Sequence, residues 1–543
     1  MNVLIGGAWP YANGSLHIGH IAALLPGDVL ARYFRAKGDT VFFVSGSDCH
    51  GTPVTIRARQ ENKTPREISD FYHNEFCDCL CRLGFSYDLY GKTSGEDHKS
   101  FVIDFHKRLY DGGYVYEKST PQAYCEKCKQ FLPDRFVKGL CPNCGENARG
   151  DQCEACGSVL EPENLLQAKC SVCGEAPEFR PANHLFLAVT RMKDELDAYI
   201  ESHRCWRKNA YEMSKRYIRE GLRDRSLTRD LDWGIDVPKD GFENKKIYIW
   251  AENVLGYVSD CYTLCLRQGL DFNEFWNCSR QYYVHGKDNI PFHTIILPSL
   301  LLGRTDTRLK FPDEIISSEY LTLEGKKIST SGNWAIWVKD ILERYNPDSV
   351  RYFLLGNGPE KRDTDFTWRE FINSHNGELL GAYGNFVNRC LIFIQKAFEG
   401  KVPETQGSPD IIPSLGKLYP CVGNLIEQGC IKDALDTLFA FIRAANKFFD
   451  EEKPWITVKT DIGKCKKTLN ACVQIIANLS LLLNPFLPFS SEKVRSTLEL
   501  GKAAWKYVEV PAGFELGPVE ILFERLDKKV IQEEEARLRG SVG

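Results

Sequence analysis

The hydrophobic residues near the N-terminus follow the pattern of a parallel β–α–β unit. Residues 2–6 form a short apolar run that ends in glycines, which indicates a buried strand. A loop rich in Gly, Pro and Asn follows, and residues 16–38 then have the period of an amphipathic helix closed by Gly38. Residues 40–45 form the next strand-like run. Ligands bind such units at the carboxyl ends of the strands, so we expect a binding site at the first loop.

Strand-like runs return after a long interruption, and helical periodicity then takes over. Runs at residues 246–250 and 281–286 resume the strand pattern, which predicts a doubly wound α/β domain divided by an insertion. Beyond about residue 370 long amphipathic periods indicate an α-helical domain that ends in a charged helix or tail. The predicted regions are 1–114 (first half of a Rossmann-like domain), 115–240 (insertion), 241–331 (second half), 332–372 (linking region) and 373–543 (helical domain with its tail).

The composition is that of a folded and nearly neutral protein. Of the 543 residues, 43% are hydrophobic and 26% are charged, and the formal net charge is −4. These values exclude a disordered chain, and they argue against a protein that coats nucleic acid through a general basic excess. No positive segment precedes the first apolar run, and the longest apolar stretches are broken by proline. We therefore expect no secretory signal, no membrane span and a cytoplasmic location.

Cysteine spacing gives the clearest chemical signal. Eight of the 21 cysteines form four C-x2-C pairs between Cys125 and Cys173. Each pair can bind one side of a tetrahedral Zn2+ ion, so eight thiolates predict two structural zinc sites rather than redox pairs. Sequential, interleaved and nested combinations of the pairs all fit the spacing. The predicted ligands are Cys125, Cys128, Cys141, Cys144, Cys153, Cys156, Cys170 and Cys173.

The loop after the first strand leads into His17-Ile18-Gly19-His20 at the start of the predicted helix. Helix-terminal N–H groups and the helix dipole attract phosphate, and a glycine lets it approach closely. Two histidines three residues apart share one helical face, so both can donate hydrogen bonds to phosphoryl oxygens. An isolated H-x-x-H is more often a pair of surface histidines. The motif therefore gains its weight from the segments that accompany it.

Three separated segments together resemble one enzyme family. Residues 10–20 are similar to the H-I-G-H signature of class I aminoacyl-tRNA synthetases, and of their methionyl branch in particular. Residues 286–288 resemble the family's second nucleotide-site segment, and residues 325–331 resemble its mobile K-M-S-K-S loop. In that loop Lys327 takes the position of the first lysine. Thr330 replaces the second lysine and supplies a hydroxyl in place of a charge.

The resemblance extends over nearly the whole chain and implies ATP, L-methionine and tRNA(Met) as substrates. Residues 47–53 and 250–257 resemble the segments that form the methionine pocket, although Asn253 and Val254 replace the Ala-Pro often found there. The resemblance implies that one carboxylate holds the substrate ammonium, while aromatic side chains enclose the polarizable thioether. The implied methionine-binding residues are Trp9, Tyr11, Asp48 (the carboxylate), Trp250, Tyr257 and His293.

The same resemblance implies a reaction in two steps. The carboxylate of methionine attacks the α-phosphate of ATP, and the resulting adenylate is attacked by the terminal 2′-OH of tRNA. Catalysis is then mostly positioning and charge stabilisation, with Mg2+ accompanying ATP. The implied catalytic residues are His17, His20 and Lys327. The implied ATP-binding residues are His17, Gly19, His20, Gly286, Asp288, Lys327 and Ser329.

For the metals, the resemblance favours a nested scheme. The inner pairs would hold one zinc and the outer pairs the other. The inner set is Cys141, Cys144, Cys153 and Cys156, and the outer set is Cys125, Cys128, Cys170 and Cys173.

Two regions are candidates for contact with tRNA. Asn385 and Arg389 lie at i, i+4 on one helical face, and Trp455 follows a proline at a helix boundary. Taken singly, they are a cap residue, a surface arginine and a core tryptophan. Together they resemble the anticodon reader of the methionyl family, in which the tryptophan stacks on an unstacked base. Residues 204–229 carry nine Lys/Arg and three Asp/Glu, which fits a solvated helix and acceptor-stem contact equally well.

Two rival hypotheses remain at this stage. The first is another class I synthetase for an apolar or sulfur-containing amino acid, although the short insertion leaves no room for a large editing domain of the leucyl type. The second is a zinc-knuckle RNA-binding protein that keeps the fold without activity, which only Thr330 favours. Many methionyl enzymes carry an extra C-terminal dimerising module, whereas this chain stops after a charged tail. We therefore expect a monomer.

Overall fold

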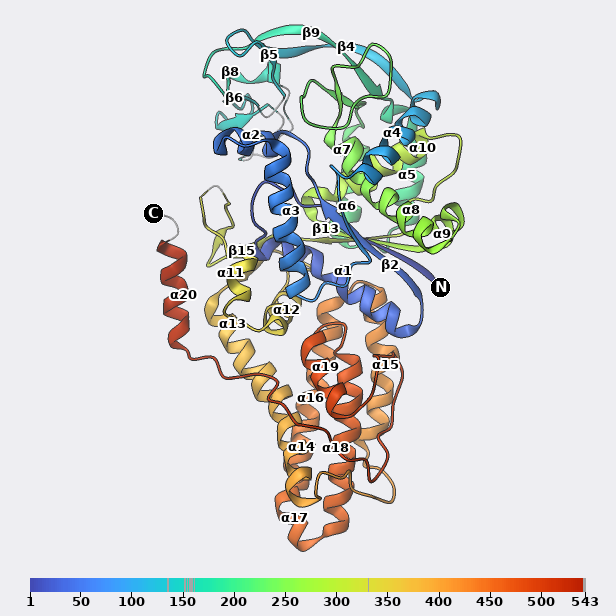
Figure 1. Ribbon diagram of the computed structural model, residues 1–543, viewed down its shortest axis with the longest axis vertical. Coiled ribbons are helices and arrows are strands. Elements are labelled where there is room, and N and C mark those ends of the chain that lie inside the picture. Colours follow the sequence, from blue (N-terminus) through green and yellow to red (C-terminus); the bar gives the residue numbers. More distant parts are fainter. Residues whose placement is uncertain are drawn as a thin grey trace.

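A five-stranded parallel sheet forms the centre of the N-terminal part of the molecule (Figure 1). The computed structural model describes residues 1–133, 136–150, 153, 155, 160, 162–330 and 332–540. The strand order is β14-β13-β1-β2-β3, and each neighbouring pair is parallel. This order confirms the doubly wound α/β fold, since β13, from beyond the insertion, lies beside β1, and β14 extends the sheet beyond β13. The strands are β1 (Asn2–Gly7), β2 (Thr40–Ser47), β3 (Leu89–Lys92), β13 (Arg280–Gly286) and β14 (Glu314–Ser318).

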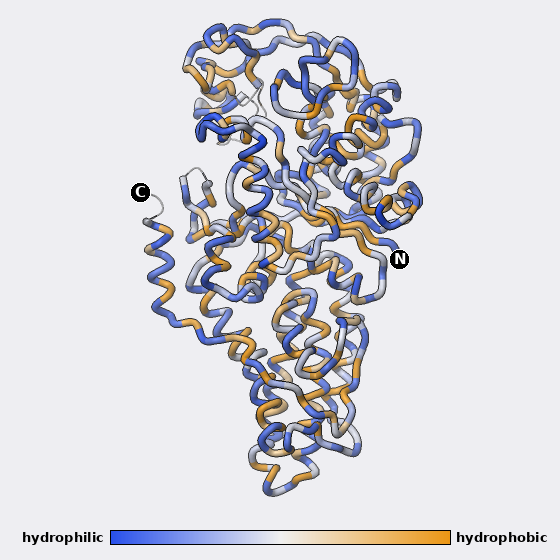
Figure 2. Tube along the Cα trace, viewed as in Figure 1, coloured by the Kyte–Doolittle hydropathy of each residue, from blue (hydrophilic) through white to orange (hydrophobic). Residues whose placement is uncertain are grey.

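Helices cover both faces of this sheet. They are α1 (Ile18–Lys37), α2 (Thr52–Glu61), α3 (Pro65–Arg82), α4 (Glu96–Asp111), α8 (Gly256–Gln268), α9 (Phe272–Cys278) and α10 (Leu297–Gly303). Val3 and Ile5 of β1 are buried in a core shared with α1, whereas Leu4 lies in a separate core with α4 and α8. Successive side chains of a strand point to opposite faces, so β1 serves both layers. In Figure 2 the sheet appears as a band of mostly hydrophobic residues.

The insertion extends from the sheet on two long antiparallel strands, β4 (Val115–Cys125) and β9 (Glu178–Leu187). A small three-stranded sheet, β7-β6-β8, lies near their far end and has a hydrophobic core of its own (Figure 1). The cysteine pairs therefore sit apart from the main sheet. The other elements are β5 (Gln130–Phe131), β6 (Val137–Leu140), β7 (Asn147–Arg149), η2 (Pro162–Asn164), β8 (Leu166–Cys170), η3 (Val189–Met192), α5 (Lys193–Ser202), α6 (Lys208–Glu220), β10 (Arg225–Ser226) and β11 (Thr228–Arg229).

The strand predicted at residues 246–250 is wrong in most of its length. Only β12 (Lys246–Ile247) is a paired strand, and its partner is β11 outside the main sheet, while Tyr248 is extended but belongs to no sheet. The chain then turns into the short helix α7 (Ile249–Glu252), a 3-10 turn (Asn253–Leu255) and α8. Ile249, Trp250 and Ala251 are apolar in succession, and both Ile249 and Ala251 are buried although they lie in a helix. Periodicity cannot distinguish such a segment from a buried strand.

The chain reaches the C-terminal bundle through a connecting region. Its elements are β15 (Leu321–Leu323), β16 (Lys326–Lys327), α11 (Val338–Leu342), α12 (Pro347–Gly356), β17 (Thr364–Phe366) and α13 (Trp368–Ser374). Two short helices, η5 (Lys287–Asn289) and η6 (Phe292–Ile296), lie earlier, between β13 and α10. The bundle tapers away from the sheet (Figure 1). It comprises η7 (His375–Gly384), α14 (Asn385–Ala397), α15 (Ile411–Glu427), α16 (Ile431–Glu452), α17 (Pro454–Thr460), α18 (Ile462–Leu482) and α19 (Pro488–Thr497).

The last helix, α20 (Lys529–Gly540), leaves the bundle and returns to α13 (Figure 1). Its Glu534 is buried, and the carboxylate accepts hydrogen bonds from Arg344 at 2.7 Å and from the Tyr345 hydroxyl at 3.0 Å. Of the two predicted alternatives, a charged helix or a tail, the described residues form a docked helix.

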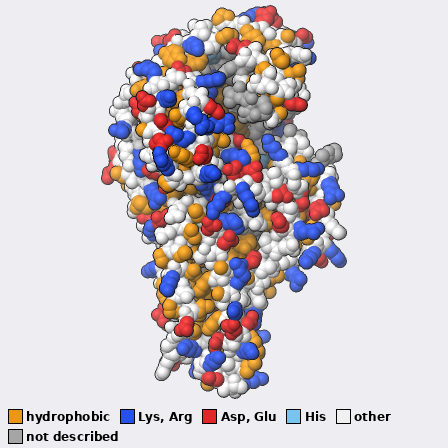
Figure 3. All heavy atoms as spheres, turned by 180° about the vertical axis from the view of Figure 1, so that it is seen from behind, with side chains coloured by type: hydrophobic (Ala, Val, Ile, Leu, Met, Phe, Trp, Pro, Cys, Tyr) orange, Lys and Arg blue, Asp and Glu red, His pale blue; other side chains and the backbone are white. Residues whose placement is uncertain are grey.

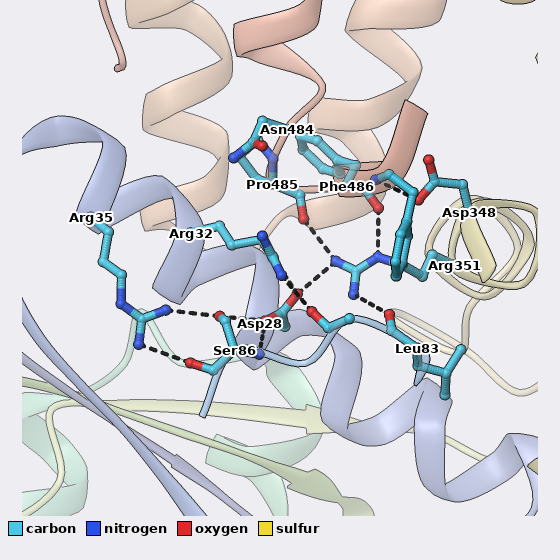
Figure 4. A network of polar contacts seen from close by, with 12 residues as sticks. Asp28, Arg32, Arg35, Leu83, Ser86, Asp348, Arg351, Asn484, Pro485 and Phe486 are labelled. Carbon is cyan, nitrogen blue, oxygen red and sulfur yellow. Dashed lines mark hydrogen bonds and ion pairs between the residues drawn. The ribbon is translucent and has the colours of Figure 1, made fainter. Parts of the chain in front are cut away.

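A buried polar network joins the sheet domain to the bundle (Figure 4). The fully buried guanidinium of Arg351 donates to Asp28 of α1 at 2.7 Å, to the carbonyl of Leu83, and to the carbonyls of Pro485 and Phe486 between α18 and α19. Burial alone would raise the pKa of Asp28, but Arg32 and Arg351 hold it below its usual value. The helix that begins at His17 is therefore fixed to the bundle.

On the surface, charges of both signs are interspersed. Figure 3 shows Lys and Arg side chains mixed with Asp and Glu over the face opposite to that of Figure 1. Within the described part of the chain, no helix has the length and apolar character needed to cross a membrane.

Candidate active site

The two histidines of the H-I-G-H segment form a reciprocal cap at the start of α1. His17 is the N-cap, and its Nδ1 accepts a hydrogen bond from the Gly19 N–H at 3.1 Å. In return, Nδ1 of His20 accepts from the His17 N–H at 3.2 Å, and the two rings stack with centroids 3.8 Å apart. A Cβ added at Gly19 would lie 3.0 Å from the His17 ring, which explains the glycine between them.

This cap fixes the protonation of both rings. Burial lowers the pKa of His20 to about 4, and burial together with the neighbouring His20 lowers the pKa of His17 well below its ordinary value. Both imidazoles are therefore neutral near pH 7. Because Nδ1 of each ring accepts from the backbone, the single proton of each ring resides on Nε2. The two Nε2–H groups are the donors that remain for a ligand.

The loop resembling K-M-S-K-S lies next to this cap, although 310 residues separate Lys327 from His17 in the sequence. Trp337 pairs with His17 in an antiparallel bridge, and Ile18 donates to the carbonyl of Ile336 at 3.1 Å. The hairpin β15–β16 presents Lys327, which is exposed and has its ammonium 5.9 Å from the centre of the Tyr320 ring.

The second half of the loop closes on itself. Ser329 and Trp334 exchange backbone hydrogen bonds at 2.9 Å, and Thr330 between them is exposed. The ammonium of Lys326 lies 4.8 Å from the centre of the Trp334 ring, so this lysine is directed to the loop. Ser331 lies outside the described residues.

Gly286 and Asp288 follow β13 at its carboxyl end, where ligands bind parallel sheets. A Cβ on Gly286 would meet no atom within 4 Å among the described residues, so the backbone there is open to a ligand. Asp288 accepts a hydrogen bond from the Tyr320 hydroxyl. Sequence reasoning did not identify Tyr320, because an aromatic residue before a strand carries no signal of its own. Its ring links the Asp288 segment to Lys327.

Aromatic side chains form one wall of the candidate methionine pocket. Trp250 stacks on Phe292 at 3.7 Å and meets the edge of Tyr11 at 6.2 Å. Nearby, the Tyr257 hydroxyl lies 2.9 Å from Nε2 of His293, whose Nδ1 is 2.8 Å from the Asn289 carbonyl. The carbonyl can only accept, so His293 carries its proton on Nδ1 and Nε2 accepts from Tyr257. A cleft opens beside this wall, lined among others by Tyr11, His50, Arg229, Trp233 and Trp250.

Trp9 occupies a slot made of glycines. A Cβ added at Gly46 or Gly256 would lie 2.5 Å from its indole, and one at Gly91 would lie 3.0 Å away. The indole is buried and meets the Tyr257 ring edge-on at 6.5 Å. The three glycines come from two strands and one helix, and they make room for a residue much larger than the site could otherwise hold.

Asp48 follows β2 and is almost fully buried, with 1% of its surface exposed. Its backbone pairs with the first loop, since Ala12 donates to the Asp48 carbonyl and Asp48 donates to that of Pro10, both at 2.8 Å. Burial, together with the negative charge of Glu252, raises the pKa of the Asp48 carboxyl well above its usual value. A cation bound here would remove that cost.

The cysteine pairs combine in the nested order. The sulfurs of Cys125, Cys128, Cys170 and Cys173 lie within 4.8 Å of one another, and so do those of Cys141, Cys144 and Cys153. Measured separations of 3.4, 4.0 and 3.6 Å match the roughly 3.8 Å expected between thiolates on one tetrahedral Zn2+. Cys156, the fourth predicted ligand of the inner set, lies outside the described residues.

The three residues predicted to read an anticodon lie close together at the far end of the bundle. The Arg389 guanidinium is 5.8 Å from the centre of the Trp455 ring, and it forms an ion pair with Asp450 at 2.8 Å. Trp455 is 43% exposed, which excludes its role as a core residue. Asn385, one helical turn before Arg389, is exposed on α14.

Comparison with known proteins identifies the family. The family model "tRNA synthetases class I (M)" matches residues 3–391, and that of the "Anticodon binding domain of methionyl tRNA ligase" matches residues 415–542. Methionine--tRNA ligase 1 of Alkaliphilus oremlandii is 53% identical over 540 residues, covering 99% of this chain and all of that protein. Methionine--tRNA ligase of Bacillus mycoides is 52% identical over 546 residues, with complete coverage of both chains.

Solved structures show the same fold. The crystal structure of Mycobacterium tuberculosis methionyl-tRNA synthetase bound by methionyl-adenylate has a TM-score of 0.82 and covers 96% of this chain and 100% of that one, at 20% identity. One family model spans most of this chain, and relatives align with it at more than half identity over its full length. The chain therefore belongs to the methionyl-tRNA synthetases of class I.

Proposed function

We propose that the chain is a methionine–tRNA ligase that forms methionyl-adenylate and transfers the methionyl group to tRNA(Met). The observation that carries this function is the contact of the α1 cap with the segment of the K-I-S-T-S loop. The bridge between His17 and Trp337 makes this contact, and the buried carboxylate of Asp48 lies beside it. Neutral donors, a mobile cation and an ammonium site are the three parts that activation of an amino acid by ATP requires.

In the first step an oxygen of the methionine carboxylate attacks the α-phosphorus of ATP, and the bond to the pyrophosphate leaving group breaks. The Nε2–H groups of His17 and His20 donate to phosphate oxygens, and they add no net charge because both rings are neutral. Gly19, Gly286, Asp288 and Ser329 complete the ATP site. Lys327 supplies the positive charge that meets the departing pyrophosphate. Mg2+ accompanies ATP as part of the substrate.

Methionine is held by its two ends. Asp48 receives the ammonium, and the aromatic wall with Trp9, Tyr11, Trp250 and Tyr257 receives the thioether chain. His293 holds the Tyr257 hydroxyl at 2.9 Å and so orients that ring.

In the second step the 2′-OH of the terminal adenosine attacks the methionyl carbonyl, and AMP leaves. The adenylate is a mixed anhydride, so the protein supplies no covalent nucleophile. The cluster of Asn385, Arg389 and Trp455 reads the CAU anticodon, with the exposed indole stacking on a base and the two polar side chains bonding to base edges.

Two Zn2+ ions stabilise the insertion. The outer set supplies four thiolates, which fill a tetrahedral site and make that metal structural. The inner set brings Cys141, Cys144 and Cys153 together, and its fourth predicted ligand, Cys156, lies outside the described residues. We further propose that the chain acts as a monomer in the cytoplasm.

Methionine-dependent exchange of labelled pyrophosphate into ATP tests this function. We expect exchange with L-methionine and none with leucine or cysteine. Exchange that depends on another amino acid would favour the first rival hypothesis. The absence of exchange with any amino acid, in a protein that still binds tRNA, would favour the inactive RNA-binding protein.

A further inference from the structure

A second carboxylate lies next to the proposed ammonium site. Glu252 ends α7 and has no exposed surface. Its Oε1 lies 2.7 Å from Nδ1 of His50, which is also buried. Among the described residues, no hydrogen-bond partner reaches its other oxygen, Oε2. An ionisable oxygen buried without a partner is costly, so it calls for a specific occupant.

Asp48 also has a buried oxygen that makes no hydrogen bond among the described residues. Its Oδ1 accepts a hydrogen bond from the backbone N–H of His50 at 3.3 Å, whereas Oδ2 makes none among the described residues, although the side-chain amide of Asn253 lies near enough to oppose part of the rise in the pKa of Asp48. His50 therefore contacts both carboxylates, through its backbone on one side and through its ring on the other. The two acidic groups are close enough for the charge of Glu252 to raise the pKa of Asp48.

The missing occupant has to be a cation with several hydrogen-bond donors. A metal ion fits poorly, because Asp48, His50 and Glu252 do not form one of the groups in the described chain whose ligand atoms converge on a single point. A primary ammonium carries three donors and one positive charge, which suits two separate carboxylate oxygens.

We propose that Glu252 is a second carboxylate of the methionine site. Its Oε2 receives one N–H of the substrate ammonium, and Asp48 receives another. His50 is the positioning residue that orients both carboxylates. This inference rests on the proposed function, since it assigns a further residue to the same amino-acid site. Specificity for an α-amino acid would then depend on a pair of carboxylates from two distant segments of the chain.

The test compares two ligands with the variant Glu252→Gln. L-Methionine carries the ammonium, and 4-(methylthio)butanoate is the same molecule without it. In the variant the amide oxygen accepts from His50, which leaves the amide N–H2 facing the ammonium. We expect the dissociation constant of L-methionine to rise by about tenfold to a hundredfold, and that of 4-(methylthio)butanoate to change by less than about twofold. Both constants are obtained from competition in pyrophosphate exchange and from equilibrium binding to the full chain.

Two further variants complete the experiment. Glu252→Asp keeps the charge and should retain more of the affinity for L-methionine than Glu252→Gln does. Asp260→Asn is the matched control, because Asp260 is also a buried carboxylate with one unpartnered oxygen among the described residues, yet it lies on α8 behind Gly91. It should not discriminate between the two ligands.

The outcomes distinguish the role inferred for Glu252 from the proposed function of the chain. Equal weakening of both ligands by Glu252→Gln would mean a structural role, and unchanged binding of both would mean no role, so either result overturns the inference. Failure of the unaltered protein to bind L-methionine would instead overturn the proposed function.

Discussion

At the scale of single residues, the site is defined by which polar atoms are already satisfied and which are not. His17 and His20 use their Nδ1 atoms to cap α1, so their roles as ligand donors are set by the backbone. Asp48 and Glu252 present oxygens without partners among the described residues. The motif residues could be predicted from the sequence because each segment is short. The pairing of His50 with Glu252 could not, since those residues are 202 positions apart and meet only through the fold.

Asp48→Asn should make the empty protein more stable while it impairs methionine binding. The raised pKa of Asp48 means that its ionised form is disfavoured in the folded state. The free-energy cost of burying the Asp48 carboxyl is present above the unfolded carboxyl pKa of about 4, and it disappears as the pH falls below that value. We expect the variant to gain about 1–3 kcal/mol at pH 8 and to lose about a hundredfold in methionine affinity.

Thermal unfolding of the variant and of the unaltered protein at pH 8 and at pH 4.5, each without ligand, checks the predicted gain in stability. The gain should shrink at the lower pH. A variant that is less stable at pH 8 would show that the carboxylate has partners in the empty protein.

At the scale of elements, the positions that resist sequence prediction are those where one element shapes another. Trp9 fits only because Gly46, Gly91 and Gly256 leave space for its ring, and each glycine alone reads as an ordinary turn or strand residue. The helix α7 was mistaken for a strand because its burial hides the helical period. Strongly periodic elements such as α1 were predictable almost to their ends.

The nested cysteine sets predict that one metal can be removed without the other. Cys141→Ser together with Cys153→Ser should reduce the content from two zincs to one per chain, because the outer sulfurs form their own cluster. Elemental analysis of the purified protein gives the count, and Cys205→Ser, at an exposed cysteine, is the control that should keep both ions. A chain without any zinc, despite a native helical content, would point to shared ligands.

The cluster at the end of the bundle predicts a separation of the two steps. Trp455→Ala should slow aminoacylation of tRNA carrying a CAU anticodon by roughly tenfold to a hundredfold, because stacking on a base contributes about 1–3 kcal/mol. Methionine-dependent pyrophosphate exchange should remain nearly unchanged, since the indole lies in the bundle. Tyr507→Ala removes another exposed aromatic side chain of the C-terminal part of the chain, away from Trp455, and should affect neither activity. A parallel loss of both activities in Trp455→Ala would instead indicate a packing defect.

At the scale of the whole molecule, the fold concentrates neutral histidines in its interior. Burial lowers the pKa of His98 and His184 to about 3 and that of His106 and His293 to about 4, and it lowers the pKa of His285 well below its ordinary value. Each of them stays neutral in the folded chain at a pH where the unfolded chain binds a proton. The sequence shows where the histidines stand in the chain. Their burial, however, follows only from the packing of the two hydrophobic layers.

Acid should therefore destabilise the protein early. The contribution of the histidines to stability should be constant above pH 7 and fall below the unfolded histidine pKa of about 6.5, because only the unfolded chain then takes up protons at these rings. Each such group loses about 1 kcal/mol between pH 6.5 and 5.5, so these five together with His17 and His20 amount to a loss on the order of 7 kcal/mol. The unfolding midpoint measured across this interval checks the prediction, and His106→Gln should flatten the curve. A midpoint that stays level down to pH 5 would mean that these histidines are charged in the fold.

The buried polar network of Arg351 (Figure 4) bears on whether the bundle can be exchanged between related chains. Arg351 meets the bundle through the carbonyls of Pro485 and Phe486, and main-chain oxygens are the same whatever side chains surround them. Asp28, the charge that Arg351 needs, lies on the N-terminal side with it. A bundle exchanged from a relative with the same loop path would present the same acceptors. The buried ion pair thus stays within one parental segment, so this contact sets no barrier to a productive chimaera. Glu427 of α15, which pairs with Lys37 and Arg280, is a side chain that an exchanged bundle would have to match.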